Sequence, residues 1–294
     1  MPRIHANGIE LEYEDHGTPD APVILLVMGL GAQLTLWPIE LVEALVERGF
    51  RVIRYDNRDI GLSHKFEGVR APGFMRTALM KRFGFTPRTP YTLTDMADDG
   101  AALLEALDIP GAHVVGASMG GMIAQLIAVN HPEKTTSLTS IMSTTGNPKL
   151  PMADKDAMRA LTARPPSMEH DVLVEHGMGV ARAIGSPDYP TPEARLRERT
   201  AANVTRSVYP QGMQRQLAAI IADGDRRKRL RAVTAPTLVI HGEADPLVKC
   251  EGGRDTAAAI PGAQLKIIPG MGHDLPLELV EEIADAIVGH ARAV

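Results

Sequence analysis

Apolar runs, helical spacings and turns succeed one another from the first residues of the chain. Residues 2–16 alternate apolar and polar positions, with a turn at Asn7-Gly8, as in a β-hairpin. Residues 23–27 are continuously apolar, which is typical of a strand buried on both faces. Residues 38–49 then space their apolar side chains at the period of a helix. The pattern therefore predicts a hairpin, a buried strand and a helix in that order.

The same alternation of strand and helix continues along the chain. Further strands are expected at residues 51–55, 113–117, 138–143, 236–241 and 264–268, and further helices at residues 92–107, 119–130 and from about 276. Strands that alternate with helices favour a mostly parallel sheet covered by helices on both faces. We therefore predict an α/β fold of this architecture.

Two segments interrupt the alternation. Residues 64–91 form a basic and apolar excursion, and residues 146 to about 232 have a helical pattern throughout. The second segment is inserted between two strands of one sheet, so it would lie over their carboxyl ends, where open α/β sheets bind ligands. We therefore predict a core domain of residues 1–145 and 233–294, with a helical cap, or lid, of residues 146–232.

A Gly-x-Ser-x-Gly sequence at residues 116–120 connects an expected strand to an expected helix. Its serine, Ser118, would occupy a sharp turn in which flanking side chains would collide with the backbone, which accounts for the glycines. The turn holds the hydroxyl above the sheet, and the helix directs its free N–H groups to the same place. Ser118 is therefore the candidate nucleophile; the alternative is a structural turn whose serine only caps the helix.

A serine hydroxyl needs a general base, and the chain offers ten histidines. His273 lies on a glycine-rich loop directly after the last expected strand, from which it can reach the same crevice, so we assign it as the base. His241 ends the preceding strand and is the main alternative, although we expect it to pack or hydrogen-bond locally. His64, His170 and His176 lie in the excursion or the cap, where substrate contact stays open.

The base needs a partner at its second ring nitrogen to hold its tautomer and orientation. Asp245 follows a strand and is our candidate, and the chain order Ser118, Asp245, His273 is one that Ser-His-Asp triads use. Glu243 is the local alternative. No carboxylate directly follows residues 138–143, so the other strand end that would suit the acid has none to offer.

The tetrahedral intermediate of acyl transfer needs two fixed hydrogen-bond donors. One should be the backbone N–H of Met119, which follows the nucleophile, and the other should come from the loop after the strand 23–27. We choose Leu30, because Gly29 and Gly31 on either side let the backbone approach a substrate. A dinucleotide-binding loop is the competing interpretation, but its third glycine is missing.

A dense polar turn covers residues 55–63. Its arginine, Arg58, is flanked by Asp56 and Asp59, and we expect it to pair with one of them. The turn would then fix the loops around the site.

Composition excludes several other classes of function. The net charge is −5 and no long run of Lys or Arg occurs, which argues against a nucleic-acid partner. A lone cysteine, Cys250, excludes an intramolecular disulfide and thiolate zinc clusters, and no residue group has metal-ligand spacing, so neither metal nor cofactor is expected. No apolar segment is long enough to span a membrane, and the N-terminus lacks the apolar core of a signal peptide, so we expect a cytoplasmic protein. Formation of a homo-oligomer stays open.

Four motifs together resemble the α/β-hydrolases: Leu-Leu-Val-Met-Gly at 25–29, Ile-Arg-Tyr-Asp-Asn-Arg-Asp at 53–59, Val-Val-Gly-Ala-Ser-Met-Gly at 114–120 and Pro-Gly-Met-Gly-His at 269–273. Within that superfamily the chain looks most like small bacterial serine carboxylesterases similar to aclacinomycin methylesterase. The resemblance implies the α/β-hydrolase fold, the triad Ser118, Asp245 and His273, and the oxyanion donors Leu30 and Met119. Many relatives begin the oxyanion loop with His-Gly where this chain has Met-Gly, and the 64–91 excursion looks longer, so their substrate is not carried over.

We therefore expect a serine carboxylic-ester hydrolase that acts on short or medium apolar esters through an acyl-enzyme intermediate, with a small-molecule ester as its partner. Two alternatives use the same triad, a carbon–carbon bond hydrolase and a cofactor-free perhydrolase. A third is a ligand-binding protein of this fold without turnover, which an intact triad disfavours but the fold alone does not exclude.

Overall fold

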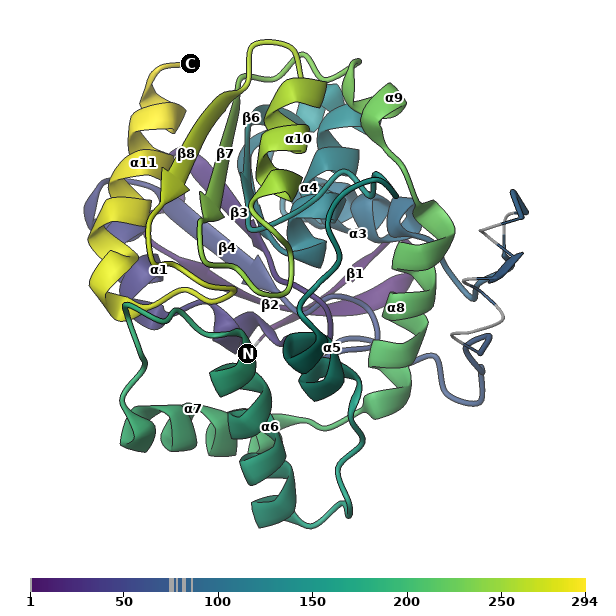
Figure 1. Ribbon diagram of the computed structural model, residues 1–294. Helices are drawn as coiled ribbons and strands as arrows, with labels where there is room; N and C mark the ends of the chain where they lie inside the picture. Colours follow the sequence, from purple (N-terminus) through teal and green to yellow (C-terminus); the bar gives the residue numbers. More distant parts are fainter. Residues whose placement is uncertain (1, 74–76, 78, 81–82, 86) are drawn as a thin grey trace.

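The computed structural model describes residues 2–73, 77, 79–80, 83–85 and 87–294. Within these residues the strands form one eight-stranded sheet in the order β1-β2-β4-β3-β5-β6-β7-β8 (Figure 1). The strands are β1 (Arg3–Ala6), β2 (Ile9–His16), β3 (Val23–Val27), β4 (Arg51–Tyr55), β5 (Ala112–Ala117), β6 (Thr135–Ile141), β7 (Thr237–Gly242) and β8 (Gln264–Ile268). The pairs β1–β2 and β2–β4 are antiparallel and the other neighbouring pairs are parallel, so the predicted hairpin and the mostly parallel sheet are confirmed.

Helices alternate with the strands as predicted, with two differences. The helices are α1 (Ile39–Glu47), α3 (Leu93–Ala106), α4 (Met119–Asn130), α5 (Lys155–Thr162), α6 (His170–Ile184), α7 (Glu193–Arg206), α8 (Pro210–Asp223), α9 (Arg227–Leu230), α10 (Glu251–Ala259) and α11 (Val280–Arg292), with short 3-10 turns η1 (Leu34–Leu36), η2 (Pro132–Lys134) and η3 (Leu277–Leu279). The strand expected at 138–143 begins earlier, because its first residues are polar and lack the apolar pattern. Helix α10 was not predicted, because Gly252 and Gly253 weaken its helical pattern.

The sheet is buried on both faces because alternate residues of its central strands face opposite sides. On β3, Leu25 and Val27 join the apolar cluster that includes α3 and α4, whereas Ile24 and Leu26 join the cluster that includes α1 and α11. All four side chains are fully buried. The continuous apolar run in the sequence therefore corresponds to a strand that contributes to both halves of the core.

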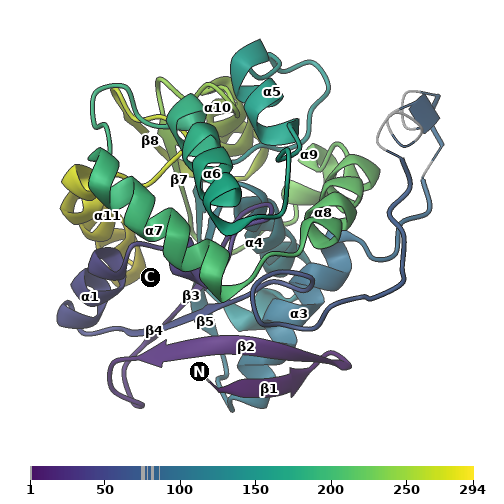
Figure 2. The same ribbon diagram turned by 90° about the horizontal axis from the view of Figure 1, so that it is seen from below.

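The segment between β6 and β7 supplies helices α5 to α9. In Figure 1, α5, α6 and α7 lie beyond the arrowheads of β7 and β8, and Figure 2 shows α5 to α8 arranged across that end of the sheet. This segment has an apolar cluster of its own, formed by Val174, Met178 and Leu196 of α6 and α7. We propose on this arrangement that residues 146–232 are a cap on the core.

The predicted 64–91 excursion falls partly outside the described residues, at 74–76, 78, 81–82 and 86. Its two ends meet on the core, where the rings of Phe66 and Tyr91 lie 5.4 Å apart and both lie beside the Arg58 guanidinium. Contacts of this kind between rings and a guanidinium stabilise both ends of a loop. The excursion is therefore anchored where it leaves the core and where it returns.

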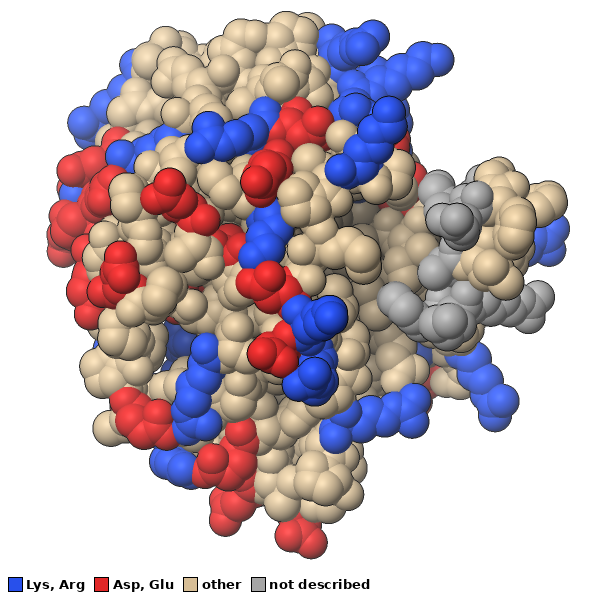
Figure 3. All heavy atoms as spheres, viewed as in Figure 1, with Lys and Arg blue, Asp and Glu red and all other residues tan. Residues whose placement is uncertain are grey.

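The surface carries charges of both signs. On the face in Figure 3, basic residues gather at the upper right, where the α9 residues Arg227, Lys228 and Arg229 lie, and acidic residues gather at the left, over α11 with Glu281 and Glu282. Within the described part of the chain, no helix combines the length and apolarity that crossing a bilayer requires.

Candidate active site

Ser118 joins the end of β5 to the start of α4 in a tight turn. Its φ of +58° lies in a region that non-glycine residues seldom adopt, and such conformations concentrate at functional sites. A Cβ on Gly116 would lie 2.1 Å from the carbonyl oxygen of Gly120, and a Cβ on Gly120 would lie 1.9 Å from the carbonyl oxygen of Val27. The two glycines therefore let β5, α4 and β3 come close enough to form the turn, as the motif predicts.

Ser118, His273 and Asp245 meet at the carboxyl edge of the sheet. His273 Nε2 lies 2.9 Å from Ser118 Oγ, and His273 Nδ1 lies 2.7 Å from Asp245 Oδ2. The three residues follow β5, β8 and β7, and the carboxyl ends of parallel strands share one edge. Ser118 is partly exposed, whereas His273 and Asp245 are buried. The arrangement can move a proton from the serine to the imidazole while the carboxylate orients the ring.

Asp245 is held as a carboxylate in a fully buried position. Its Oδ1 accepts hydrogen bonds from the backbone N–H groups of Leu247 and Val248, both at 2.8 Å. Burial by itself raises the pKa of Asp245, but the charge of His273 and the hydrogen bonds from His241 and His273 lower it well below its ordinary range. One carboxylate oxygen is therefore fixed by the backbone, and the other faces the base.

His241, the alternative base, lies behind the acid rather than beside the serine. Its Nε2 donates to the carbonyl oxygen of Val248 at 2.7 Å and lies 3.5 Å from Asp245 Oδ2. Its Nδ1 has no hydrogen-bond partner in the described ranges and faces Gly253, where a Cβ would come within 2.6 Å. The expected local hydrogen bond is confirmed, and the approach to Asp245 is an additional contact that sequence reasoning did not find.

The two candidate oxyanion donors belong to two backbone segments that adjoin Ser118, the start of α4 and the loop after β3. Met119 is buried and is the first residue of α4, so its N–H has no carbonyl one turn earlier in the helix to donate to. In the loop after β3, a Cβ on Gly29 would lie 3.1 Å from Ser118 Cβ and 3.5 Å from Ser118 Oγ. The loop after β3 therefore passes directly beside the serine.

That loop, residues 28–32, is called the oxyanion loop below. The N–H of Ala32 donates to the carbonyl oxygen of Gly29 at 3.3 Å, which closes a turn with Leu30 and Gly31 at its centre. Gly31 has φ of +67°, the left-handed conformation that the third residue of a type II turn requires and that favours glycine. The sequence Gly-Leu-Gly thus places the Leu30 backbone in a turn next to Ser118.

The polar turn at 55–63 pairs differently from our prediction. Arg58 does not pair with Asp56 or Asp59; its guanidinium makes two 2.6 Å hydrogen bonds to Asp99 of α3. Burial raises the pKa of Asp99 even though the bonds from Arg58 oppose this. The prediction was wrong because Asp56 and Asp59 are occupied by partners from distant segments.

Those partners come from the cap helices. Arg206 of α7 lies 2.7 Å from Asp56 Oδ2, and Arg215 of α8 makes two 2.7 Å hydrogen bonds to Asp59. Burial raises the pKa of Asp59, but the bonds and charge of Arg215, with further hydrogen bonds, lower it below its ordinary value. Asp56 Oδ1 also accepts the N–H of Leu34, which follows the oxyanion loop. The expectation that this turn fixes loops around the site is thus confirmed, with other partners.

Two polar residues of the cap segment reach the active-site loops and were missed from the sequence. Gln216 Oε1 accepts the Gly31 N–H at 2.9 Å. Ser186 Oγ accepts the Gly272 N–H at 2.8 Å, and the His273 N–H donates to the carbonyl oxygen of Ile184, also at 2.8 Å. Neither residue belongs to a local motif, and only the position of the cap brings them to these loops.

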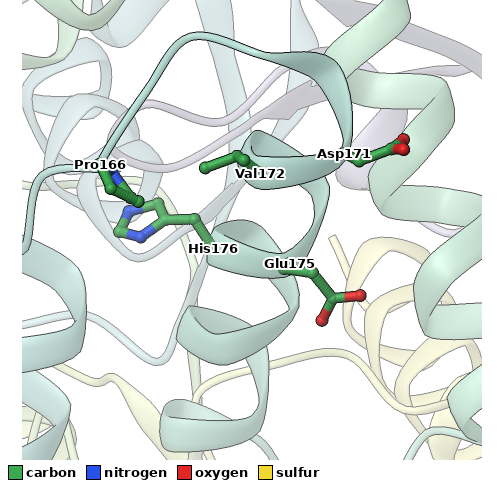
Figure 4. Close-up of a pocket in the computed structure, with 5 residues that line it drawn as sticks. All are labelled: Pro166, Asp171, Val172, Glu175 and His176. Atoms are coloured by element: carbon green, nitrogen blue, oxygen red, sulfur yellow. The ribbon is translucent and has the colours of Figure 1, made fainter.

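A surface hollow of about 450 Å³ lies elsewhere, on the cap. It is lined by Pro166, Asp171, Val172, Glu175 and His176 (Figure 4). Asp171 and Glu175 point away from His176, and the side chain of Asp171 is almost fully exposed. None of the residues that line the hollow is a nucleophile beside a base, whereas Ser118 lies beside His273. The serine site is therefore the better candidate. Among the described residues, no group of three or more His, Cys, Asp or Glu is arranged to hold a metal ion.

Comparison with known proteins shows the family to which the chain belongs. The sequence pattern of the alpha/beta hydrolase fold family matches residues 22–278. The chain is 31% identical to rhodomycin D methylesterase DauP of Streptomyces sp. (strain C5), over 99% of this chain and 97% of that protein. It is 28% identical to the putative carbamate hydrolase RutD of Variovorax paradoxus (strain S110), over 90% of this chain and 89% of that protein.

Among solved structures, the enol-lactonase from Burkholderia xenovorans LB400 superposes with a TM-score of 0.75 at 25% identity, covering 99% of this chain and 100% of that one. The fold, the family pattern and the relatives all agree with the resemblance noted from the motifs. The chain therefore belongs to the α/β-hydrolase fold family and is a hydrolase.

Proposed function

We propose that the chain is a serine carboxylic-ester hydrolase that works through an acyl-enzyme intermediate. The observation that carries the proposal is the position of His273, whose two ring nitrogens lie 2.9 Å from Ser118 Oγ and 2.7 Å from Asp245 Oδ2. A nucleophile and base within hydrogen-bonding reach, with the base oriented by a third group, are what nucleophilic catalysis requires. The assignment of Ser118, His273 and Asp245 as catalytic residues is part of this proposal.

In the proposed reaction, Ser118 Oγ attacks the ester carbonyl as its proton passes to His273 Nε2. The backbone N–H groups of Leu30 and Met119 hold the oxyanion, and the alcohol leaves with the proton from His273. A water molecule then gives its proton to the same nitrogen and attacks the acyl group. The acid is released, and the proton returns to Ser118. Asp245 keeps the imidazole in one tautomer and stabilises its charged form.

The substrates we propose are short or medium apolar esters. Apolar residues adjoin the nucleophile in the chain and along the oxyanion loop: Met119 follows Ser118, Met28 begins the loop, and Met213 of α8 packs against Gly31 of that loop. Methionine adapts to ligands of irregular shape. The 31% identical relative from Streptomyces is named a methylesterase, which makes methyl esters of apolar acids the first class to test.

The test compares wild type with Ser118→Ala on p-nitrophenyl and methyl esters of increasing chain length. We expect kcat to fall by about 10⁴- to 10⁶-fold in the variant, since loss of the nucleophile removes the covalent step. A fluorophosphonate should label the wild type and not the variant. Turnover near the wild-type rate in Ser118→Ala would refute the proposal.

The same panel separates the alternatives that share the triad. Ester turnover without peroxide supports the esterase. Product that forms only with hydrogen peroxide would indicate a perhydrolase, and cleavage of diketones alone would indicate a carbon–carbon bond hydrolase. Fluorophosphonate labelling without turnover of any of these substrates would indicate a ligand-binding protein.

A further inference from the structure

Gln216 is a fully buried amide on cap helix α8 that contacts the backbone of two loops beside the active site. Its Oε1 accepts the N–H of Gly31 at 2.9 Å, and its Nε2 donates to the carbonyl oxygen of Arg58 at 3.0 Å. Gly31 lies in the oxyanion loop, directly after Leu30. A residue 185 positions away in the sequence therefore bonds to the turn that carries a proposed oxyanion donor.

The turn needs a contact of this kind because its own sequence does not fix the orientation of the peptide between Leu30 and Gly31. The Gly31 N–H belongs to the central peptide of the turn between Gly29 and Ala32. Glycine adopts positive and negative φ about equally, so that peptide can rotate between turn types without a steric penalty at Gly31. A hydrogen-bond acceptor fixed in space on the N–H side of the peptide selects one of these orientations.

The helix that carries Gln216 is itself fixed to the core. The neighbouring residue, Arg215, makes a bidentate ion pair with Asp59, and both side chains are almost fully buried. One turn earlier, a Cβ on Gly212 would lie 2.2 Å from the carbonyl oxygen of Asp59, so the helix backbone packs directly on the turn after β4. The amide of Gln216 therefore has a well-defined position relative to the sheet.

We infer that Gln216 is a positioning residue that holds the oxyanion loop in the shape that directs the Leu30 N–H at the developing oxyanion. This inference rests on the proposed function, because it takes Leu30 as a donor. A donor that stabilises only the transition state affects kcat more than KM. The cap thus contributes to catalysis by orienting a core loop, besides covering the site.

The first test is Gln216→Met, which keeps the length of the side chain and removes the acceptor. We expect kcat for esters to fall by about 10- to 100-fold, less than the effect of deleting an oxyanion donor outright. KM should change by less than about threefold, as for an interaction made only in the transition state. The Ki of a trifluoromethyl ketone, which forms a tetrahedral adduct with the serine, should rise by the same factor as kcat falls.

Gln125→Met is the matched control. Gln125 is also fully buried and also makes two side-chain hydrogen bonds, to Ser140 and Arg226, but it does not touch the oxyanion loop. We expect this control to lower the melting temperature comparably while kcat stays within about twofold of wild type. Equal losses of kcat in both variants, or no loss in Gln216→Met, would overturn the inference.

A second change keeps the test decisive if Gln216→Met does not fold. Replacing the amide of Gly31 by an ester removes only the N–H and leaves every side chain in place. It should reproduce the loss of kcat and the rise in Ki, and wild-type kcat in this variant would overturn the inference. Ser118→Ala in the same series separates the two ideas, because an active Ser118→Ala defeats the proposed function itself.

Discussion

The sheet core and the cap are built from different contacts. The core buries its sheet between two large apolar clusters, whereas cap helices α6 and α7 share one small cluster of their own around Val174, Met178 and Leu196. Besides Ala219 of α8 and Leu230 of α9, which belong to a core cluster, buried ion pairs join the cap to the core, Arg206 with Asp56 and Arg215 with Asp59. Apolar packing accepts many arrangements, but a bidentate ion pair accepts very few.

This difference matters for the active site because the two regions supply different parts of it. The triad side chains all project from the core strand ends. The loops that carry the base and Leu30 are bonded to the cap, through Ser186 and Gln216. Displacing the cap as a rigid lid would break these bonds, so we expect the cap to keep its position relative to the triad during turnover.

The largest expected effect is that of a substitution in the sheet core, Asp245→Asn. We expect kcat to fall by about 10⁴-fold, because an amide favours the wrong tautomer of His273. The melting temperature should change little, since the amide oxygen can still accept the N–H groups of Leu247 and Val248. Steady-state kinetics and thermal unfolding measure the two quantities. A fall in kcat of less than tenfold would show that Asp245 does not orient the base.

The next largest effect is expected at the junction between cap and core, formed by the pairs Arg206–Asp56 and Arg215–Asp59, in the variant Arg215→Met. Removing Arg215 leaves the carboxylate of Asp59 buried without its bidentate partner, which costs about 3–5 kcal/mol of unfolding free energy. Urea unfolding followed by circular dichroism measures it. Arg159→Met is the control in the cap, because its pair with Asp156 is exposed and should cost less than about 1 kcal/mol. Equal costs in both variants would mean that burial of the junction pair contributes nothing.

The core could be predicted closely from the sequence, because its signals are local. The apolar run of β3 and the glycine motif around Ser118 are each short, continuous stretches of sequence. Ser118, Asp245 and His273 come shortly after the ends of β5, β7 and β8. The parallel sheet then brings these strand ends together, as the structure shows for Ser118, Asp245 and His273. The roles assigned to them stay predictions until activity is measured.

The junction could not be predicted, because it depends on pairs far apart in the sequence. Arg58 stands next to two aspartates in the chain, yet it bonds to Asp99, while the two aspartates receive arginines from the cap. Gln216 has no motif around it, and its role follows only from where α8 lies. Sequence patterns fix which face of a helix is buried, but they do not fix which buried polar groups meet.

The smallest expected effect is the acid dependence of the same junction. In the wild type, Arg215 and other partners lower the pKa of Asp59 below the value of about 3.9 in the unfolded chain. The stabilising contribution of the Asp59 carboxylate is therefore complete above that unfolded value and is lost as the pH falls through the folded pKa.

In Arg215→Met, burial without the guanidinium should instead raise the pKa of Asp59. Acid then protonates the carboxylate and removes the cost of burying an unpaired charge. The difference in unfolding free energy between wild type and Arg215→Met should thus narrow from about pH 7 to about pH 4. The other carboxylates titrate alike in both proteins, so their contributions drop out of this difference. Urea titrations across this range test it, with Arg159→Met expected to differ little from wild type throughout. A difference that stays constant or widens in acid would show that the charge of Asp59 does not hold the cap to the core.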